Sequence, residues 1–156
     1  MRLLKMVSRI LPFVVLFTQT LASAQQSPAT AGSTTPADVW PQFRGNAALT
    51  GVSETTLPAE LTLQWTYEAD EAIDSSAAIA DGSVYVGTWA GTLVSLDLAT
   101  GTERWTYSTG GMGIAESSPA IAGDLVFIGD LGGVFHAVDT ATGVARWKFE
   151  TMGETK

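Results

Sequence analysis

The sequence contains no cysteine among its 156 residues. This absence excludes disulfide bonds, thiolate nucleophiles and cysteine-ligated zinc or iron–sulfur sites. Because no disulfide can reinforce the fold, its stability must come from core packing. No stretch after residue 24 combines a 3.6-residue apolar period with capping residues, so the sequence predicts no helix there.

Basic residues are scarce, and three of the eight lie in the first nine positions. They precede the apolar run ILPFVVLFTQTL and the small residues ASA, which end at Ala24. This order is typical of a Sec-type signal peptide over residues 1–24, cleaved after Ala24. The apolar run is shorter than the roughly 20 residues of a membrane-spanning helix; an uncleaved N-terminal anchor is the alternative. We therefore expect an exported protein, periplasmic or extracellular, with no membrane insertion after cleavage.

Acidic residues dominate the rest of the chain. The signal contains three basic and no acidic side chains, so the mature chain has five basic residues, 16 acidic residues and a net charge of −11. This charge repels nucleic acids and anionic membranes, and neither is an expected partner. Residues 25–37 are rich in Ser, Thr, Ala and Pro and predict a flexible linker, which places the folded part at residues 38–156.

One phrase of sequence occurs twice at a constant interval, so that Asp97 recurs as Asp139 and Trp105 as Trp147. Residues 74–105 and 116–147 align without a gap and are identical at 14 of 32 positions. A partial third copy precedes them, because LQWTYEA resembles ERWTYST and places Trp65 before Trp105 at nearly the same interval. A fixed period of this size indicates a repeat architecture.

Each repeat contains four short segments with the composition of strands. In the first full copy they are SSAAIA, GSVYVGT, GTLVSLDL and TERWTYS, joined by turns rich in Gly. Four short antiparallel strands form one blade of a β-propeller. We therefore predict an all-β fold: an incomplete propeller with an opening segment at 38–67, one outer strand around Trp65, and blades at 75–108 and 117–150.

The turn before the last strand of each repeat carries the most regular pattern. The aspartate is placed to accept hydrogen bonds from the amides that follow it, and the glycine supplies a positive φ where the chain reverses. The tryptophan lies on the outermost strand, where its N–H needs an acceptor on the next blade. The predicted blade-docking residues are Asp97, Thr100, Gly101 and Trp105, their copies Asp139, Thr142, Gly143 and Trp147, and Trp65 of the partial copy.

The pattern in SLDLATGTERW and AVDTATGVARW resembles the tryptophan-docking motif of quinoprotein-type propellers, which are built from pyrroloquinoline-quinone-like (PQQ-like) repeats. SSPAIAGDLVFIGD is similar to the first two strands of that repeat, and WPQFRGNAALTGVSETTLPAELTLQW resembles the opening segment of exported bacterial members. The resemblance covers about residues 38–150. The chain is similar to the propeller subunits of the outer-membrane β-barrel assembly machinery. This resemblance implies that it binds protein partners through propeller loops or strand edges.

The chain has too few residues for a closed ring. Propellers have about 4–8 blades of about 40–45 residues, so even four blades need about 160 residues. The folded part offers 119. We expect the N-terminal fragment of a longer propeller. The alternative is a ring of several chains, in which each protomer would carry one strand too many.

Few side chains are candidates for binding or chemistry. Asp74 and Glu116 occupy equivalent positions before the innermost strand, near the channel mouth, either as an acidic ring for a cation or basic peptide or as solvated turn residues. His136 aligns with a valine on a strand between blades and is expected to be a packed core histidine. Trp89 has Leu131 as its counterpart and is a candidate recognition anchor, with packing as the alternative.

In the opening segment, Trp40, Phe43 and Arg44 are expected to pack against the propeller. Three functions remain open for the whole chain. The first is an exported, non-catalytic scaffold with protein partners and no cofactor. The second is the N-terminal part of a PQQ-dependent alcohol or sugar dehydrogenase. The third is the sensor or ligand-binding domain of a larger surface protein.

The dehydrogenase alternative would bring PQQ and calcium. The resemblance implies that such enzymes hold quinone and calcium with carboxylates and an Asn, and use an Asp as base. The only asparagine of this chain is Asn46, in the opening segment. None of the family's catalytic residues has a match here, so the sequence assigns no catalytic, cofactor or metal residue.

Overall fold

A computed structural model describes residues 39–153 of the protein. The predicted signal peptide at 1–24 and the predicted linker at 25–37 lie outside the described residues. The described part contains no α-helix, and therefore none that is long and apolar enough to cross a membrane.

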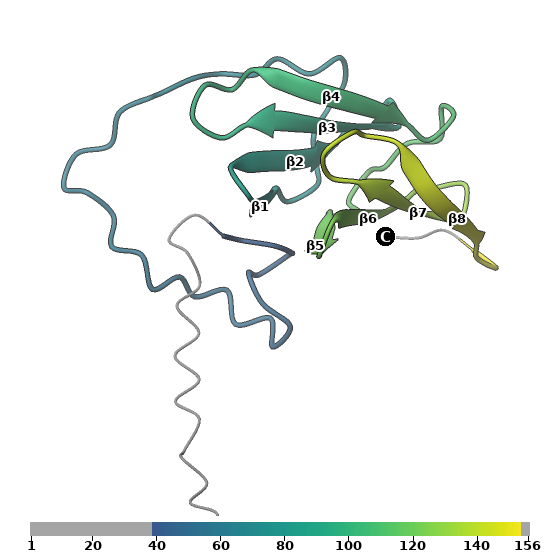
Figure 1. Ribbon diagram of the computed structural model, residues 1–156, viewed down its shortest axis with the longest axis horizontal. Helices are drawn as coiled ribbons and strands as arrows, with labels where there is room; N and C mark the ends of the chain where they lie inside the picture. The colour runs from purple at the N-terminus through teal and green to yellow at the C-terminus, as the bar shows by residue number, and fades with distance from the viewer. Residues whose placement is uncertain (1–38, 154–156) are drawn as a thin grey trace, which may run out of the picture. The chain divides into compact units, whose positions relative to one another are not determined.

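The described chain forms eight strands in two antiparallel sheets of four (Figure 1). The strands of the first sheet, in order, are β1 (Ala78–Ala80), β2 (Ser83–Gly87), β3 (Thr92–Asp97) and β4 (Glu103–Ser108). Those of the second are β5 (Ala120–Ala122), β6 (Leu125–Gly129), β7 (Val134–Asp139) and β8 (Ala145–Glu150). Each sheet is a four-stranded meander, the unit of a propeller. The predicted all-β, incomplete propeller is confirmed.

The sequence repeat is also a repeat of backbone geometry. The third and fourth strands of each sheet pair with one register shift, between Ser95 and Leu96 in the first blade and between Ala137 and Val138 in the second. A shift of this kind is a local bulge, which increases strand twist. Both bulges lie just before the turn aspartate, so the same sequence period sets the twist of both blades.

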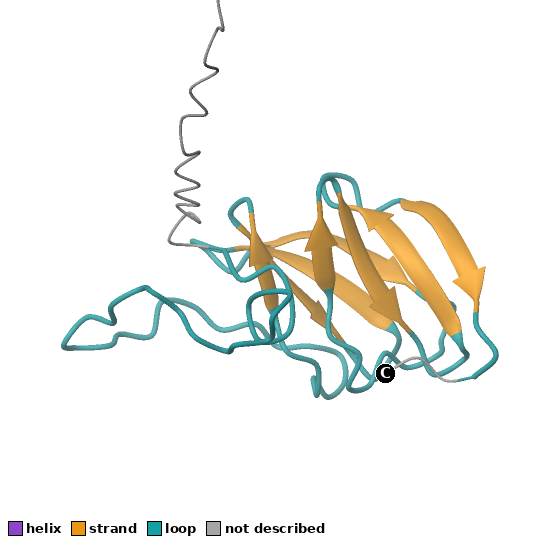
Figure 2. Ribbon diagram, turned by 90° about the horizontal axis from the view of Figure 1, so that it is seen from below, coloured by secondary structure: helices purple, strands orange, loops and turns teal. Residues whose placement is uncertain are grey.

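The two sheets lie side by side (Figure 2), and together they bury one shared apolar core. Its fully buried members are Tyr85, Leu93, Ile114, Val126, Ile128 and Val138. Trp105 and Tyr107 of β4 pack against this cluster. Since side chains alternate across a strand, one face of the first blade meets the opposite face of the second.

The opening segment runs along the innermost strands of both blades. Trp40 and Ile79 of β1 exchange two backbone hydrogen bonds, each of 2.8 Å. The amide of Ile121 in β5 donates to the carbonyl oxygen of Pro41 at 2.8 Å. The segment therefore joins the two blades at β1 and β5.

Two expectations for the N-terminal half need correction. Phe43 does not pack against the propeller, because 51% of its surface is exposed, and Arg44 is exposed as well. Trp40 contacts β1 through its backbone, and its ring lies against Gly45 of the same opening segment. Residues 61–69 around Trp65 form no strand, because no strand of the described chain pairs with their backbone.

Candidate functional site

The turn between β3 and β4 is organised by one carboxylate. Oδ1 of Asp97 accepts hydrogen bonds from the amides of Ala99 and Thr100 at 3.0 and 2.9 Å, and from the hydroxyl of Thr100 at 3.0 Å. Gly101 completes the reversal with φ of +70°. An L-residue with a side chain rarely adopts this conformation, so the turn requires glycine.

The turn between β7 and β8 repeats this arrangement. Oδ1 of Asp139 accepts from the amides of Ala141 and Thr142 at 3.1 and 2.9 Å, and from the hydroxyl of Thr142 at 2.8 Å. Gly143 also has φ of +70°. The two turns therefore present the same backbone surface to a side chain that packs on them.

Each turn aspartate also forms an ion pair that the sequence analysis missed. Nη2 of Arg104 lies 2.7 Å from Oδ2 of Asp97, and Nη2 of Arg146 lies 2.6 Å from Oδ2 of Asp139. Arg104, followed by the hydrogen bonds of Thr100, lowers the pKa of Asp97 to about 2. Arg146 and then Thr142 lower the pKa of Asp139 to about 2 in the same way. The signal was present as an arginine seven positions after each aspartate.

We expect these ion pairs to make stability fall in acid. The folded-state pKa values of about 2 lie below the ordinary value of 3.8, so the stabilisation is complete above about pH 4 and is lost as the pH falls towards 2. Urea midpoints measured from pH 6 to pH 2 test this expectation. The double variant Asp97→Asn, Asp139→Asn should show a shallower loss over that window; an unchanged pH profile would contradict it.

Two tryptophans dock on these turns. The indole Nε1 of Trp65 donates to the carbonyl oxygen of Leu98 at 2.9 Å, and Trp105 donates to the carbonyl oxygen of Thr140 at 2.9 Å. The rings lie so close that a Cβ on Gly101 would be 2.6 Å from the ring of Trp65. On Gly143 it would be 2.7 Å from the ring of Trp105. Each tryptophan thus contacts a docking turn in two ways: its indole N–H donates to a turn carbonyl, and its ring packs on the turn glycine.

Trp147 has no such turn among the described residues, and 45% of its surface is exposed. Its ring lies 5.8 and 6.2 Å from the rings of Phe127 and Phe135, and Phe149 beside it is 64% exposed. We name these four aromatic residues the open blade face. It comprises side chains from β6, β7 and β8 on one side of the second blade.

The open blade face repeats a surface that is buried in the first blade. Its members are the repeat counterparts of Tyr85, Leu93, Trp105 and Tyr107. Those four contact the second blade through the shared core. By repeat symmetry, the open blade face has the chemistry of an interface without its partner among the described residues.

The candidate carboxylates Asp74 and Glu116 belong to no metal-binding cluster among the described residues. Asp74 and Glu116 are both exposed, and Oδ2 of Asp74 accepts a hydrogen bond from Nε1 of Trp89 at 2.7 Å. The amide of Asn46 donates to the hydroxyl of Thr50 within the opening segment. Nowhere in residues 39–153 do three His, Asp or Glu side chains come together as a metal site. The described residues therefore do not fit a quinone–calcium site.

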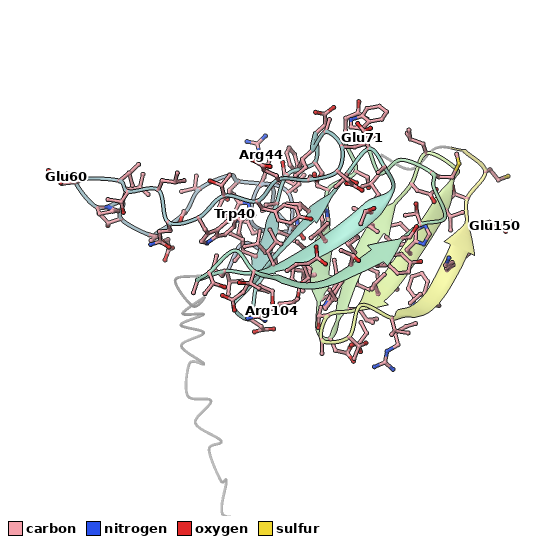
Figure 3. The ribbon with its side chains drawn as sticks, turned by 90° about the horizontal axis from the view of Figure 1, so that it is seen from above. Trp40, Arg44, Glu60, Glu71, Arg104 and Glu150 are labelled. Atoms are coloured by element: carbon pink, nitrogen blue, oxygen red, sulfur yellow. The ribbon has the colours of Figure 1, made fainter. Side chains whose placement is uncertain are left out.

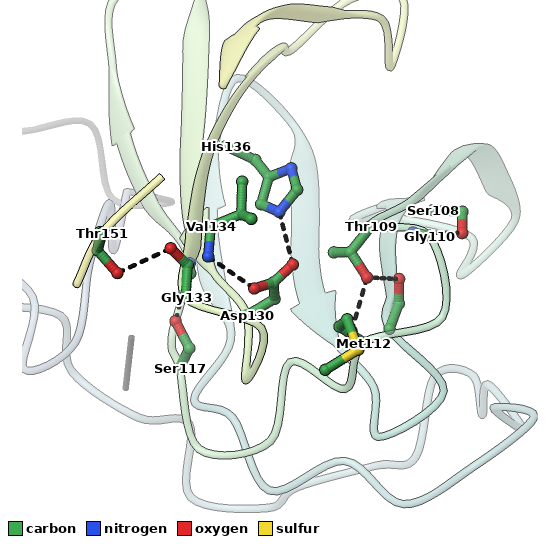
Figure 4. Close-up of polar contacts among 12 residues, drawn as sticks. Ser108, Thr109, Gly110, Met112, Ser117, Asp130, Gly133, Val134, His136 and Thr151 are labelled. Carbon is green, nitrogen blue, oxygen red and sulfur yellow. Dashed lines mark hydrogen bonds and ion pairs between the residues drawn. The ribbon is translucent and has the colours of Figure 1, made fainter. Parts of the chain in front are cut away.

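His136 is buried, as predicted, with 1% of its surface exposed. The sequence analysis missed its hydrogen bonds. Nδ1 lies 2.8 Å from the hydroxyl of Tyr107. Nε2 lies 3.0 Å from Oδ2 of Asp130, the contact that Figure 4 shows. Since a carboxylate only accepts, Nε2 carries the hydrogen of the bond to Asp130. The first repeat has Val94 where the second has His136, and Thr88 where the second has Asp130. This joint difference between the repeats could have indicated that His136 and Asp130 contact each other.

Removing the hydroxyl of Tyr107, which forms a hydrogen bond between the two blades, should therefore lower the stability of the fold. Tyr107→Phe leaves Nδ1 of the buried His136 without its hydrogen-bond partner, and we expect a loss of about 1–3 kcal/mol in the free energy of unfolding. The matched control is Tyr67→Phe, because the hydroxyl of Tyr67 contacts Glu103 at 3.5 Å in an exposed position. Chemical denaturation of both variants measures the difference. Equal losses would contradict the assignment of the hydrogen bond.

Comparison with known proteins agrees with this geometry. Residues 55–156 match the family described as outer membrane protein assembly factor BamB. Among curated proteins no sequence matches the chain significantly. The crystal structure of BamB from Moraxella catarrhalis is similar at 28% identity and a TM-score of 0.52, over 58% of this chain and 28% of that one.

A second similar structure is the quinohemoprotein alcohol dehydrogenase from Comamonas testosteroni, at 24% identity and a TM-score of 0.67. It is matched over 76% of this chain and 20% of its own length. The chain thus spans less than a third of either structure, and the likeness to the dehydrogenase concerns the fold alone. The match to the family covers more than half of the chain, and the protein belongs to this BamB family of PQQ-like repeat propellers.

Proposed function

We propose that the protein is an exported, non-catalytic scaffold that binds protein partners, and that it is the N-terminal part of a longer propeller. The observation that carries this proposal is the open blade face. Four aromatic side chains in interface register have no partner blade among residues 39–153, and exposed aromatic surface of this kind marks association. The partner at this face is another blade of the same repeat.

The interface between the two blades defines what that partner must present. Trp147 needs a turn with a glycine beneath its ring and a carbonyl oxygen for Nε1, as Gly143 and Thr140 provide for Trp105. The remaining aromatic residues need an aliphatic surface such as Val126 and Ile128 provide. A turn of the form Asp-x-x-Thr-Gly, preceded in the chain by β-branched strands, meets both requirements.

The polar residues of the repeat support a structural role. Both turn aspartates are bound by their own turn amides and by arginine. Ser75 and Ser117, another repeated position, accept hydrogen bonds from the amides of Gly87 and Gly129 at 3.0 and 3.1 Å. These side chains stabilise the blades and offer no free nucleophile or base. The N-terminal part of a dehydrogenase that uses PQQ and calcium remains the competing function.

Export rests on the sequence of residues 1–24 and fits the family, whose description names outer membrane protein assembly. We expect the protein in a periplasmic or extracellular fraction, with an N-terminus at Gln25. Peptide mass spectrometry of that fraction measures the N-terminus. An unprocessed protein in the cytoplasm would contradict export.

Site-specific photo-cross-linking in the native cell tests the partner at the open blade face. A photo-reactive phenylalanine analogue replaces Phe149, and the matched control replaces Glu150, which points to the other side of β8. We expect position 149 to cross-link to a polypeptide segment with the Asp-x-x-Thr-Gly repeat, and position 150 not to. Identical products from both positions, or no repeat-bearing polypeptide from position 149, would overturn the proposal.

A further inference from the structure

The loops at one end of the two blades form a surface distinct from the open blade face. In an antiparallel meander, the β2–β3 and β6–β7 turns leave the sheets at the same end as the β4–β5 connection. The docking turns lie at the opposite end. The loop end exposes three large apolar side chains: Ile73 at 39%, Trp89 at 41% and Met112 at 47%.

These three side chains lie on segments that contact one another. The backbone amide of Trp89 donates to the carbonyl oxygen of Ala72 at 2.9 Å, which holds the residues around Ile73 beside it. A Cβ on Gly113 would lie 2.8 Å from the carbonyl oxygen of Trp89 and 3.6 Å from its ring. The residues therefore form one patch, and we name Ile73, Trp89 and Met112 the loop-end patch.

Trp89 is held in place before any partner arrives. Its Nε1 donates to the carboxylate of Asp74 at 2.7 Å, although the ring is partly open to solvent. An indole fixed in this way loses little side-chain entropy on binding. Tryptophan and methionine are also enriched in interfaces, and methionine adapts to varied partners. The repeat itself does not require this tryptophan, because Leu131 stands at the equivalent position.

The charge around the loop-end patch is negative. Exposed carboxylates on the loops of this end belong to Asp70, Glu71, Asp74 and Glu116. Three of the four described cations are engaged elsewhere: Arg104 and Arg146 at the docking turns, and Lys148 over the ring of Tyr107. Figure 3 shows Glu71 and Arg104 on opposite sides of the blades, with Arg44 on the side of Glu71. A cationic partner is therefore attracted to this end.

We propose that the loop-end patch binds a polypeptide segment in which apolar side chains alternate with Lys or Arg. The apolar side chains cover Trp89 and Met112, and the cations face the surrounding carboxylates. This inference deepens the proposed scaffold function and rests on it, but it concerns a surface separate from the open blade face. The chain then holds a sister blade through one surface and a basic partner segment through another.

The test uses the full chain and a short fluorescent peptide in which Lys alternates with Leu and Phe, with a Glu-for-Lys peptide as control. Fluorescence anisotropy should show saturable binding of the Lys peptide alone, weakened by added salt. Trp89→Leu should weaken binding about tenfold or more, as expected for an anchor residue. This variant introduces the residue that the second repeat already carries at the same position.

The matched control is Leu63→Ala, because Leu63 is 85% exposed and lies outside the patch. Its binding should equal that of the parent chain, and so should that of Phe149→Ser on the open blade face. Absence of saturable binding, equal binding of the Glu peptide, or unchanged binding by Trp89→Leu would overturn the proposal. The cross-linking result at position 149 is independent of all three outcomes, so failure of this inference and failure of the scaffold proposal are distinguishable.

Discussion

Replacing Trp105 with alanine should lower the free energy of unfolding by about 3–5 kcal/mol, whereas the same change at Trp147 should cost about 1 kcal/mol or less. Trp105 packs on Tyr85 with ring centroids 5.8 Å apart, covers Gly143, and donates to the carbonyl oxygen of Thr140. Trp147 contacts aromatic residues of its own blade and is 45% exposed. The two residues share one motif, but only Trp105 is followed by a further blade among the described residues.

Thermal and urea unfolding of both variants measure this difference. At about 4 °C or more per kcal/mol, the melting temperature should fall by more than about 10 °C for Trp105→Ala. Trp147→Ala serves as the matched control, since both changes remove the same side chain from the same motif. Similar losses at both positions would contradict the assignment of Trp105 as the residue that joins the blades.

Gly143→Ala is expected to destabilise the protein more than Gly123→Ala, by about 1–3 kcal/mol, the usual cost of overpacking. Both glycines have positive φ, +70° and +61°, so both changes carry a backbone penalty of about 1–2 kcal/mol. They differ in space. A Cβ at Gly143 would lie 2.7 Å from the ring of Trp105, whereas nothing lies within 4 Å of a Cβ at Gly123.

Urea denaturation of the two alanine variants isolates the part of the cost that comes from docking. Adding Trp105→Ala to each variant closes a double-mutant cycle. In that background the extra cost of Gly143→Ala should disappear, because the clashing ring is gone. An extra cost that persists without the ring would show that the turn, and not the docked tryptophan, requires glycine most strongly.

Much of the fold could be predicted because the repeat specifies local geometry twice. The constant interval between the two copies placed the strands, the glycines and the docking turns in both of them. Residues that close or cap a turn contact residues a few positions away, so their roles can be predicted from the sequence alone. Asp97 and Gly101 are examples, because the hydrogen bonds that close their turn join near neighbours in the sequence.

The remainder depends on contacts between segments, which a pattern does not specify. The hydrogen bonds of His136 on β7 reach Tyr107 on β4 of the other blade and Asp130 in the β6–β7 turn. The position of His136 in the sequence therefore predicted its burial but not these partners. The bond between Trp89 and Asp74 joins residues 15 positions apart. The predicted strand at Trp65 has a strand-like sequence, but a strand also needs a neighbour, and the described chain supplies none.

The central claim is that the open blade face is a docking surface for another blade of the same repeat. It is tested most directly by supplying that blade. In an extended chain, a second copy of residues 112–153 follows residue 153, which gives Trp147 a turn with the glycine and the carbonyl that Trp105 uses. Because stability in repeat arrays is roughly a sum of units and interfaces, the urea midpoint should rise.

The decisive measurement is the cost of Trp147→Ala in the extended chain, relative to its cost in the original one. We expect the loss in unfolding free energy to rise from about 1 kcal/mol or less to about 3–5 kcal/mol, the value expected for Trp105→Ala. A cost that stays near its original value, in an extended chain that folds, would contradict the claim that this face docks a further blade.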